Sequence, residues 1–264
     1  MASSELANVV VQSSILFHVP HSSTRFPSRE GCIRLDLIPG EVEKLTDWYT
    51  DKIFTVPGTE TLRADFSRVF CDVERFWPDE AEPMSARGMG FYYTHTDDGQ
   101  HFRDDGGFKA LVKEHYYDAH QLRLAGLVDS RLESTGQCCI IDGHSFADAP
   151  CLREECQDPN RPDICIGTDP FHTPDWLAAA VMQVYRSAGY DVRVNWPFSG
   201  AMVPTAHYRK DNRVLSVMVE INRRLYLRQG AAIPGSLARL RALAEQVVAA
   251  ITGSVMDGSQ VSPR

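Results

Sequence analysis

Short apolar runs along the chain predict buried β-strands. Residues 14–19, 138–142 and 215–221 consist mainly of apolar side chains, and polar or turn-forming residues follow each run. The run at 215–221, with sequence LSVMVEI, is the strongest of these signals, and residues 192–194 give a weaker fourth one. Runs this short and apolar are typical of strands that are covered on both faces of a sheet.

Longer segments between these runs have apolar positions at three- and four-residue steps, which predicts amphipathic helices. The expected helices are residues 39–54, 108–132, 176–188 and 237–251. Residues 61–73 alternate loosely and predict an extended segment. It would bring three arginines to one region: Arg63, Arg68 and Arg75. Residues 77–107, rich in Gly, Pro and Asp, predict a long surface loop.

Strands that alternate with helices predict an α/β fold. A chain of 264 residues with 43% hydrophobic positions can bury a full core, and its length is ordinary for one domain. We therefore expect a single three-layer domain over residues 1–264, with its core at about 14–251 and a mixed, mainly parallel sheet between helices. In such folds, ligands bind at the carboxyl ends of the strands.

Charge and composition exclude several classes of function. The formal net charge of −8 and a sequence pI near 5.6 argue against a nucleic-acid-binding surface, which needs clustered Lys and Arg. No window approaches the roughly 18 apolar residues of a membrane span, and the first residues lack the pattern of a signal peptide. We therefore expect a cytoplasmic protein that binds neither nucleic acid nor membrane, and its oligomeric state stays open.

The seven cysteines do not have the pattern of a disulfide framework. Their number is odd and they are scattered through a mid-sized chain, so reduced thiols are the simpler interpretation. Cys151, Cys156 and Cys165 leave open a structural zinc site, but they lack CxxC spacing and a nearby His. We favour small buried or loop residues at these positions.

Three side chains that can take part in catalysis stand at the ends of predicted strands. His21 follows the first run, His144 follows the second in the sequence Asp-Gly-His-Ser, and Glu220 is near the end of the last. A catalytic zinc needs three ligands from His, Asp or Glu and an open position for water. Either histidine alone would more often be a hydrogen-bonded structural residue, but two in the same setting indicate a metal site.

Five sequence blocks in a fixed order resemble the N-formylglutamate amidohydrolases. They are VPHSST, TDWYTDKIF, RADFSRVFCDVER, IIDGHSF, and NWPFSG leading to VMVEINRRLY, and they span roughly residues 14–227. This family is similar to the zinc carboxypeptidases, which have a metal-binding His at a strand end, a second in an Asp-x-His-Ser turn and a late catalytic Glu. The resemblance implies that His21 and His144 bind zinc or another divalent metal and that Glu220 is the general base.

The resemblance also bears on the third metal ligand. Zinc carboxypeptidases have a Glu three residues after the first His, whereas this chain has Thr24 there. The block TDW favours Asp47 instead. Asp51 lies one turn further along the predicted helix, so either carboxylate can reach the metal while the other holds a histidine. We choose Asp47, and exposure to solvent beside Lys52 is the alternative for Asp51.

Residues of the arginine block and of a later loop are candidates for substrate binding. Arg68 and Arg75 can each hold a carboxylate through two parallel hydrogen bonds. We assign Arg68 to the oxyanion of the reaction and Arg75 to a substrate carboxylate; a structural ion pair with Asp72 or Glu74 is the alternative. The resemblance implies a substrate-binding loop formed by Asn195, Ser199 and Gly200.

Two departures from the family pattern weaken the choice of substrate. The arginine block of the family usually ends Asp-Leu-Asn-Arg-Pro, but here Glu74 puts a negative charge where an amide is expected. In the later loop, Gly200-Ala201 replaces a Gly-Gly pair. The metal chemistry is compatible with both changes, whereas the substrate can differ from formylglutamate.

The predicted function is metal-dependent hydrolysis of the amide bond of an acidic N-acyl amino acid such as N-formylglutamate, with Glu220 accepting a proton from water. One alternative is carboxypeptidase-like cleavage of a short peptide or a γ-glutamyl amide. Another is a non-catalytic protein that binds an acidic metabolite. For Glu220 itself, the alternative is an ion pair with Arg223 or Arg224. We expect His120 and His207 to be structural.

Overall fold

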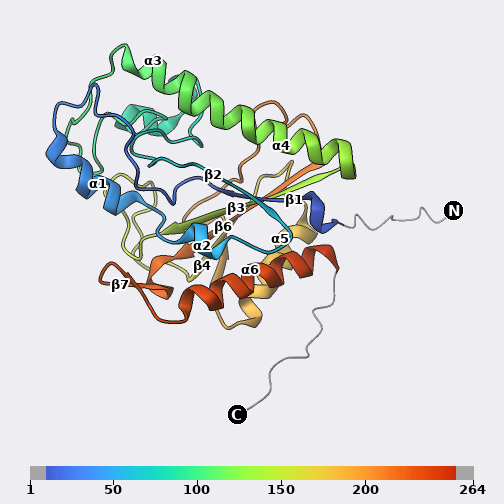
Figure 1. Cartoon of the computed structure of the whole chain (residues 1–264). Helices are drawn as coiled ribbons and strands as arrows, with labels where there is room; N and C mark the ends of the chain where they lie inside the picture. Colours follow the sequence, from blue (N-terminus) through green and yellow to red (C-terminus); the bar gives the residue numbers. More distant parts are fainter. Residues whose placement is uncertain (1–9, 254–264) are drawn as a thin grey trace.

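The computed structural model describes residues 10–253, which form one α/β domain built on a six-stranded sheet (Figure 1). The strands lie in the order β2-β1-β3-β6-β4-β5. Their bounds are β1 Ile15–Val19, β2 Glu60–Arg63, β3 Cys138–Phe146, β4 Ile164–Gly167, β5 Val192–Val194 and β6 Val214–Asn222. All neighbours are parallel except β4 and β6, which are antiparallel. The predicted mixed, mainly parallel sheet is thus confirmed.

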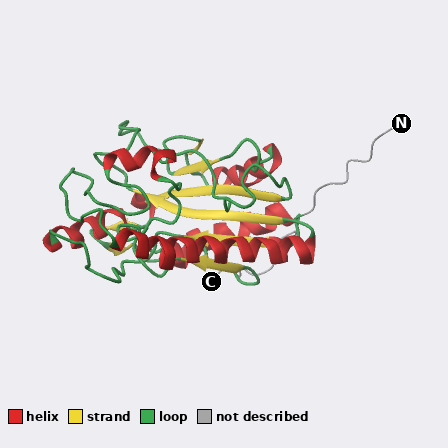
Figure 2. Ribbon diagram, turned by 90° about the horizontal axis from the view of Figure 1, so that it is seen from above, coloured by secondary structure: helices red, strands yellow, loops and turns green. Residues whose placement is uncertain are grey.

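Helices cover both faces of this sheet, which gives the three predicted layers (Figures 1 and 2). The longer helices are α4 Ala119–Thr135 on one face, and α5 Asp175–Ser187 and α6 Ser236–Thr252 on the other. The shorter ones are α1 Ile38–Leu45, α2 Thr50–Ile53 and α3 Phe108–Val112. A π-helical stretch, Lys113–Asp118, joins α3 to α4, so the predicted helix at 108–132 is confirmed and is slightly longer.

Several minor elements complete the fold. The 3-10 turns are Gln12–Ser14, Leu35–Leu37, Asp79–Ala81, Pro83–Arg87 and Arg223–Leu225, and a small hairpin consists of β7 Leu227–Arg228 and β8 Ala231–Ala232. The sequence analysis missed β4, whose four residues give too short a pattern. The outer parts of the predicted domain, residues 1–9 and 254–264, lie outside the described residues.

The two faces of the sheet follow from the two-residue period of its strands. Phe17 on β1 and Ile141 on β3 point to α5 and α6 and join the largest apolar cluster. Their neighbours Leu16 and Ile140 point the other way and pack against Leu124 of α4. Because both faces are apolar here, the strands read as continuous hydrophobic runs in the sequence.

The helix predicted at residues 39–54 is broken, and that part of the prediction is wrong. α1 ends at Leu45 because Thr46 has extended backbone angles, and α2 begins only after Tyr49, whose φ of 63° is left-handed. The intervening Asp47 donates its backbone N–H to the carbonyl of His21, 2.9 Å away. Tertiary contacts of this kind replace helical hydrogen bonds, and the sequence has no Pro or Gly there to signal the break.

The long segment at residues 77–107 is irregular, as predicted, but it is not a surface loop. Tyr93, Phe102 and Arg103 are fully buried. The guanidinium of Arg103 donates to the backbone carbonyls of Val69, Phe70 and Tyr93 and stacks on the ring of Tyr92 at 3.6 Å. The segment therefore holds the preceding arginine-rich loop in place. Of the extended stretch predicted at 61–73, only β2 is a strand.

Two predictions about composition can be compared with the structure. All seven cysteines of the chain are free thiols, and four of them are buried. None of the helices within residues 10–253 is long and apolar enough to cross a membrane.

Candidate active site

Polar side chains replace apolar ones on the α4-facing side of the sheet as the parallel strands approach their carboxyl ends. On β3, Ile140 is followed at two-residue steps by Asp142 and His144. The register places His18 of β1 beside Asp142, and Glu220 of β6 beside His144. All four polar side chains are buried. Burial of this much charge and hydrogen-bonding capacity is costly unless the groups are paired, so this edge of the sheet is the candidate site.

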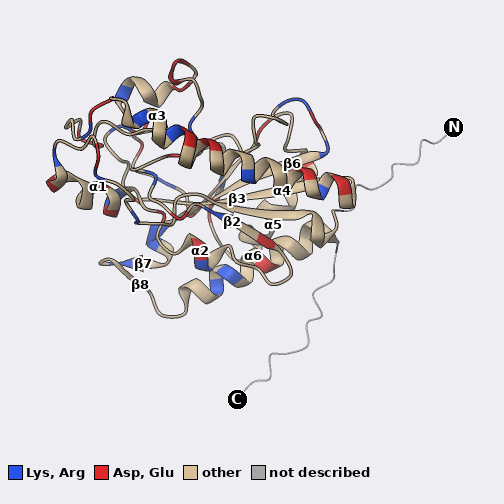
Figure 3. Cartoon of the chain, turned by 45° about the horizontal axis from the view of Figure 1, so that its top comes forward, with Lys and Arg blue, Asp and Glu red and all other residues tan. Residues whose placement is uncertain are grey.

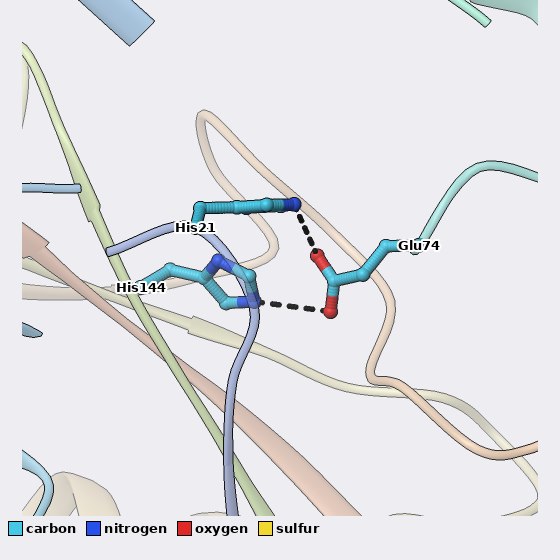
Figure 4. Close-up of side chains that lie close together, drawn as sticks. All are labelled: His21, Glu74 and His144. Carbon is cyan, nitrogen blue, oxygen red and sulfur yellow. Dashed lines mark ion pairs between the residues drawn. The ribbon is translucent and has the colours of Figure 1, made fainter. Parts of the chain in front are cut away.

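His144 lies within β3 and not in a turn after it, because the strand continues to Phe146. Its Nδ1 is 3.2 Å from Oδ2 of Asp47, and its Nε2 is 3.3 Å from Oε1 of Glu74 (Figure 4). Among the described residues, none is aligned to hydrogen-bond with Nε2, although Oδ1 of Asp142 is 3.1 Å away. Burial favours the neutral ring, but the surrounding carboxylates raise the pKa of His144 well above its usual range.

His21 lies two residues beyond β1 and faces His144, with the ring centroids 5.1 Å apart. Its Nε2 is 2.9 Å from Oδ1 of Asp72 and 3.6 Å from Oε2 of Glu74. Its Nδ1 is 3.8 Å from Oδ2 of Asp47 and has no hydrogen-bond partner within residues 10–253. Burial lowers the pKa of His21, so the ring is neutral, which is the form that binds metals.

Glu74 lies on the Nε2 side of the two imidazoles, as Figure 4 shows, and Asp47 lies on their Nδ1 side. In the described part of the chain, two groups of three residues offer potential metal ligands within 4.8 Å of one another: His21, Glu74 and His144, and His18, Glu74 and Asp142. Sequence reasoning did not identify Glu74 as a ligand. The feature of the sequence that could have pointed to Glu74 is its negative charge at the end of the arginine block.

This donor set fits a divalent metal. Two imidazoles and a carboxylate are ligands that catalytic zinc uses, and the donor separations of 3.3 and 3.6 Å are close to the roughly 3.3–3.5 Å edge of a tetrahedral zinc site. Three buried atoms of these residues have no hydrogen-bond partner within residues 10–253: His21 Nδ1, Glu74 Oε1 and His144 Nε2. Of these atoms, Glu74 Oε1 and His144 Nε2 lie 3.3 Å apart, and unsatisfied buried atoms that face each other in this way point to a bound group between them.

Asp47 is fixed by contacts on both of its carboxylate oxygens. Oδ1 accepts from Nη2 of Arg223 at 3.0 Å, and Oδ2 accepts from the backbone N–H of Ser145 at 3.2 Å. Although burial opposes ionisation, the contacts with His144 and Arg223 hold the pKa of Asp47 below its usual value. Asp47 is therefore a charged member of the cluster.

Asp51 is not part of the cluster. Its carboxylate lies 3.3 Å from Nζ of Lys52 and 3.7 Å from Nη1 of Arg63, both of which are exposed. The break between α1 and α2 separates Asp51 from Asp47, so of these two acids only Asp47 reaches the cluster. Arg63 pairs with Asp51, whereas Arg68 and Arg75 pair with Asp72, so the three arginines predicted to share a region do not share a partner.

Glu220 lies next to His144 on the adjacent strand and has an unused carboxylate oxygen. Burial, with the nearby negative charges of Asp47 and Glu74, raises the pKa of Glu220 to about 8. No hydrogen-bond partner for its Oε2 lies within the described residues. The alternative ion pairs are not formed, because Arg223 binds Asp47 and Arg224 binds two other aspartates, Asp148 and Asp163.

Arg68 and Arg75 both bind Asp72, which is fully buried. Arg68 donates to Oδ2 of Asp72 from Nε and Nη2, at 3.1 and 2.8 Å, and Nε of Arg75 is 3.3 Å from the same oxygen. The hydroxyl of Tyr93 donates to it as well, at 3.0 Å. The cations hold the pKa of Asp72 well below its usual range in spite of burial. Nη1 of Arg75 also lies 3.7 Å from Oε1 of Glu82, so two arginines pair with two carboxylates at the edge of the cluster.

The predicted substrate loop reaches the cluster through its backbone. The backbone N–H of Met202 donates to Oδ2 of Asp142 at 3.3 Å. The side chain of Asn195 forms two hydrogen bonds with Thr168, so this amide holds the start of the loop. Ser199 is exposed. Gly200 has a φ of 94°, a conformation that favours glycine.

The two secondary histidines have structural partners. Nε2 of His120, on α4, is 2.9 Å from Nε2 of His18, whose Nδ1 contacts Asp142 at 2.9 Å. His207 contacts Asp129 of α4 at 2.8 Å, away from the cluster. His18 was not identified from the sequence, because it stands inside an apolar run and not at its end.

A cavity of about 810 Å³ opens beside the cluster. Thr24, Lys44, Trp48 and Arg223 are among its lining residues, and neither histidine of the pair lines it. Arg223 also binds Asp47, so this one side chain contacts both the cavity and the Nδ1 side of the cluster.

A mixed α/β sheet with a buried group of histidines and carboxylates at the carboxyl ends of its strands is the arrangement of an α/β enzyme. The family model of N-formylglutamate amidohydrolase matches residues 13–227. The chain therefore belongs to the N-formylglutamate amidohydrolase family, whose members hydrolyse amide bonds, and the predicted resemblance is confirmed.

Solved structures support the fold. N-formylglutamate amidohydrolase from Ralstonia eutropha JMP134 is similar with a TM-score of 0.79 and 20% identity, over 92% of this chain and 95% of that one. A gene product of Agrobacterium tumefaciens is similar with a TM-score of 0.67 and 19% identity, over 92% of each chain. No curated protein matches the chain.

Proposed function

We propose that this protein hydrolyses the amide bond of an N-acyl amino acid, with N-formylglutamate as the first candidate, and that it uses a divalent metal, zinc in the first instance. The observation that carries the proposal is the buried pair of His21 and His144 beside Glu220, each with an unpaired nitrogen or oxygen within the described residues. Family membership supports the amide bond, and the relative from Ralstonia eutropha supports the substrate.

His21 and His144 would hold the metal, together with a carboxylate from the cluster. When bound there, the metal would acidify a water molecule and polarise the carbonyl of the scissile amide. Glu220 accepts the proton of the attacking water and returns it to the leaving amine. A pKa of about 8 suits both steps, because a group with this pKa exchanges its proton within about one pH unit of neutrality.

The arginine pair would bind the negative charges of the substrate and of the transition state. Asp72 uses Nε and Nη2 of Arg68, so Nη1 is available for the developing oxyanion. Arg75 would hold the substrate carboxylate. Ser199 and the backbone at Gly200 would contact the rest of the substrate, while Asn195 supports the loop. We also propose that the enzyme is cytoplasmic.

A substrate panel with zinc-loaded protein tests the proposal. It would contain N-formylglutamate, N-acetylglutamate, a γ-glutamyl amide and a short peptide with a free carboxyl terminus. We expect release of the amine from the acyl amino acids and loss of turnover after removal of the metal by a chelator. Cleavage of the peptide or the γ-glutamyl amide alone would favour a carboxypeptidase-like enzyme. Binding of glutamate without turnover of any compound, with zinc, cobalt or manganese, would favour a non-catalytic binding protein.

A further inference from the structure

Among the described residues, four carboxylates lie within 4 Å of the histidine pair. Asp72 contacts only His21 and Asp142 only His144, whereas Glu74 and Asp47 each contact both rings, one on each side. Only one of these last two needs to complete a metal site. We propose that Glu74, and not Asp47, is the third metal ligand. This inference rests on the proposed function, because it concerns the same metal. It differs from the prediction from the sequence, which favoured Asp47.

The carboxylate of Glu74 spans the two imidazoles. Oε1 is 3.3 Å from Nε2 of His144, and Oε2 is 3.6 Å from Nε2 of His21 (Figure 4). Oε1 is buried and has no hydrogen-bond partner within residues 10–253, and the same holds for Nε2 of His144. A metal between these atoms would satisfy both of them at once.

Asp47, in contrast, already has partners that suit a supporting role. Arg223 and the backbone N–H of Ser145 occupy its two oxygens. It also lies 3.2 Å from Nδ1 of His144, the nitrogen opposite to the one that faces Glu74. Metal-binding histidines usually donate their second nitrogen to a carboxylate, which fixes the ring for the metal. Asp47 has this relation to His144.

The nitrogen of His21 that faces Glu74 has a second partner. Nε2 contacts Oδ1 of Asp72 at 2.9 Å, and metal binding at Nε2 would replace this hydrogen bond. Asp72 remains well paired without it. Its Oδ1 still accepts from the backbone N–H of Glu74 at 3.3 Å, and its Oδ2 keeps Arg68 and Tyr93.

Solvent access also favours the Glu74 side. A catalytic metal needs an open position for water and substrate. The side chain of Glu74 is 18% exposed, whereas that of Asp47 is 1% exposed. A metal on the Nε2 side is therefore nearer to solvent.

Metal binding to three variants tests the inference without a turnover assay. Zinc affinity of the metal-free full-length chain would be measured by calorimetry, and the cobalt-loaded protein would be examined by visible absorption. We expect Glu74→Gln to weaken zinc binding by roughly a hundredfold or more and to change the cobalt spectrum. Asp47→Asn should keep the cobalt spectrum and lose about 10- to 100-fold in affinity at most. Glu80→Gln, an exposed control in the same region, should leave both measurements unchanged.

A conservative replacement protects the test against misfolding. Glu74→His offers another metal ligand at the same place, so it should recover zinc binding relative to Glu74→Gln and give a different cobalt spectrum. If Glu74→Gln binds zinc as the wild type does and Asp47→Asn does not, Asp47 is the ligand and the inference is wrong, while the proposed function stands. If the wild-type chain binds no divalent metal, the proposed function itself fails.

Discussion

The two faces of the central sheet differ in what they contribute. The face toward α5 and α6 is apolar over most of its length, with Phe17, Ile141 and Val219 in one continuous cluster. The face toward α4 is apolar only at the amino ends of the parallel strands and carries His144 and Glu220 near their carboxyl ends. Adjacent residues of one strand therefore pack into the apolar core on one side and contribute to the candidate active site on the other.

The position of α4 explains where the second face changes character. The helix begins beside His18, which its second residue, His120, contacts, and it extends back over the amino ends of the strands. The helix does not extend over the carboxyl ends of the strands. There, the loop with Arg68 and Glu74 lies over the sheet instead. Figure 3 shows charged residues along α4 and in the loops around the strands. The active-site face is thus covered by a polar loop where the other face is covered by helices.

The largest effect is expected on the apolar face. Ile141→Ala removes a fully buried side chain next to the catalytic strand positions. The cavity should lower the free energy of unfolding by about 2–5 kcal/mol, while the folded fraction keeps its kcat. Urea unfolding monitored by circular dichroism measures the loss. Leu122→Ala, which removes a mostly exposed leucine from α4, is the control and should change stability by no more than about 0.5 kcal/mol. A large loss of kcat in folded Ile141→Ala protein would contradict the separation of the two faces.

On the polar face, the expected loss is in catalysis and not in stability. Glu220→Gln keeps the size of the side chain but removes the proton acceptor, so kcat should fall by roughly a hundredfold or more, which is about 2.7 kcal/mol. KM should change less, and zinc should stay bound. Steady-state kinetics with metal analysis, beside the exposed control Glu133→Gln, measures this. Unchanged turnover would show that Glu220 is not the base, and loss of the metal would show that it is a ligand.

A smaller effect is expected at Gly143, which faces the apolar cluster but is flanked by two residues of the polar face. Gly143 lies between Asp142 and His144, and a Cβ at this position would be 2.4 Å from the ring of Phe54. Gly143→Ala should therefore destabilise the protein by about 1–3 kcal/mol and also displace His144. The double variant with Phe54→Leu should recover part of the stability, which a double-mutant cycle would measure. Purely additive effects would exclude the steric explanation.

The smallest effect concerns a carboxyl outside the sheet. Burial raises the pKa of Glu41, on α1, from 4.5 to about 7. The folded state then binds the proton more tightly than the unfolded state, so the contribution of Glu41 to stability is greatest below pH 4.5 and falls as the pH rises to about 7. Glu41→Gln should flatten the pH dependence of unfolding between these values. If the slope of stability against pH is the same in both proteins, Glu41 does not have this raised pKa.

The sequence predicted the parts of the fold that depend on local patterns. Long apolar runs and helical periods identified most strands and helices, because burial on both faces leaves a clear pattern. The failures have tertiary causes. β4 is only four residues long, and the break at Thr46 and Tyr49 depends on contacts of Asp47 with distant residues.

The candidate site was predicted where strand ends gave a signal. His21, His144 and Glu220 were found this way, and the structure brings them together. His18 was missed because a polar residue inside an apolar run resembles an isolated substitution. Glu74 was noticed only as a charge, because it lies in an irregular loop, and a loop gives no periodic pattern from which the direction of a side chain can be inferred.

The most direct test of the account is the zinc content and affinity of the wild-type chain beside His144→Ala. Elemental analysis of purified protein, with calorimetric titration of the metal-free form, measures both. We predict one zinc ion per wild-type chain and a large loss of binding in His144→Ala, with circular dichroism showing that the variant is folded. Equal zinc binding by the folded variant and the wild type would contradict the assignment of the buried histidine pair as a metal site.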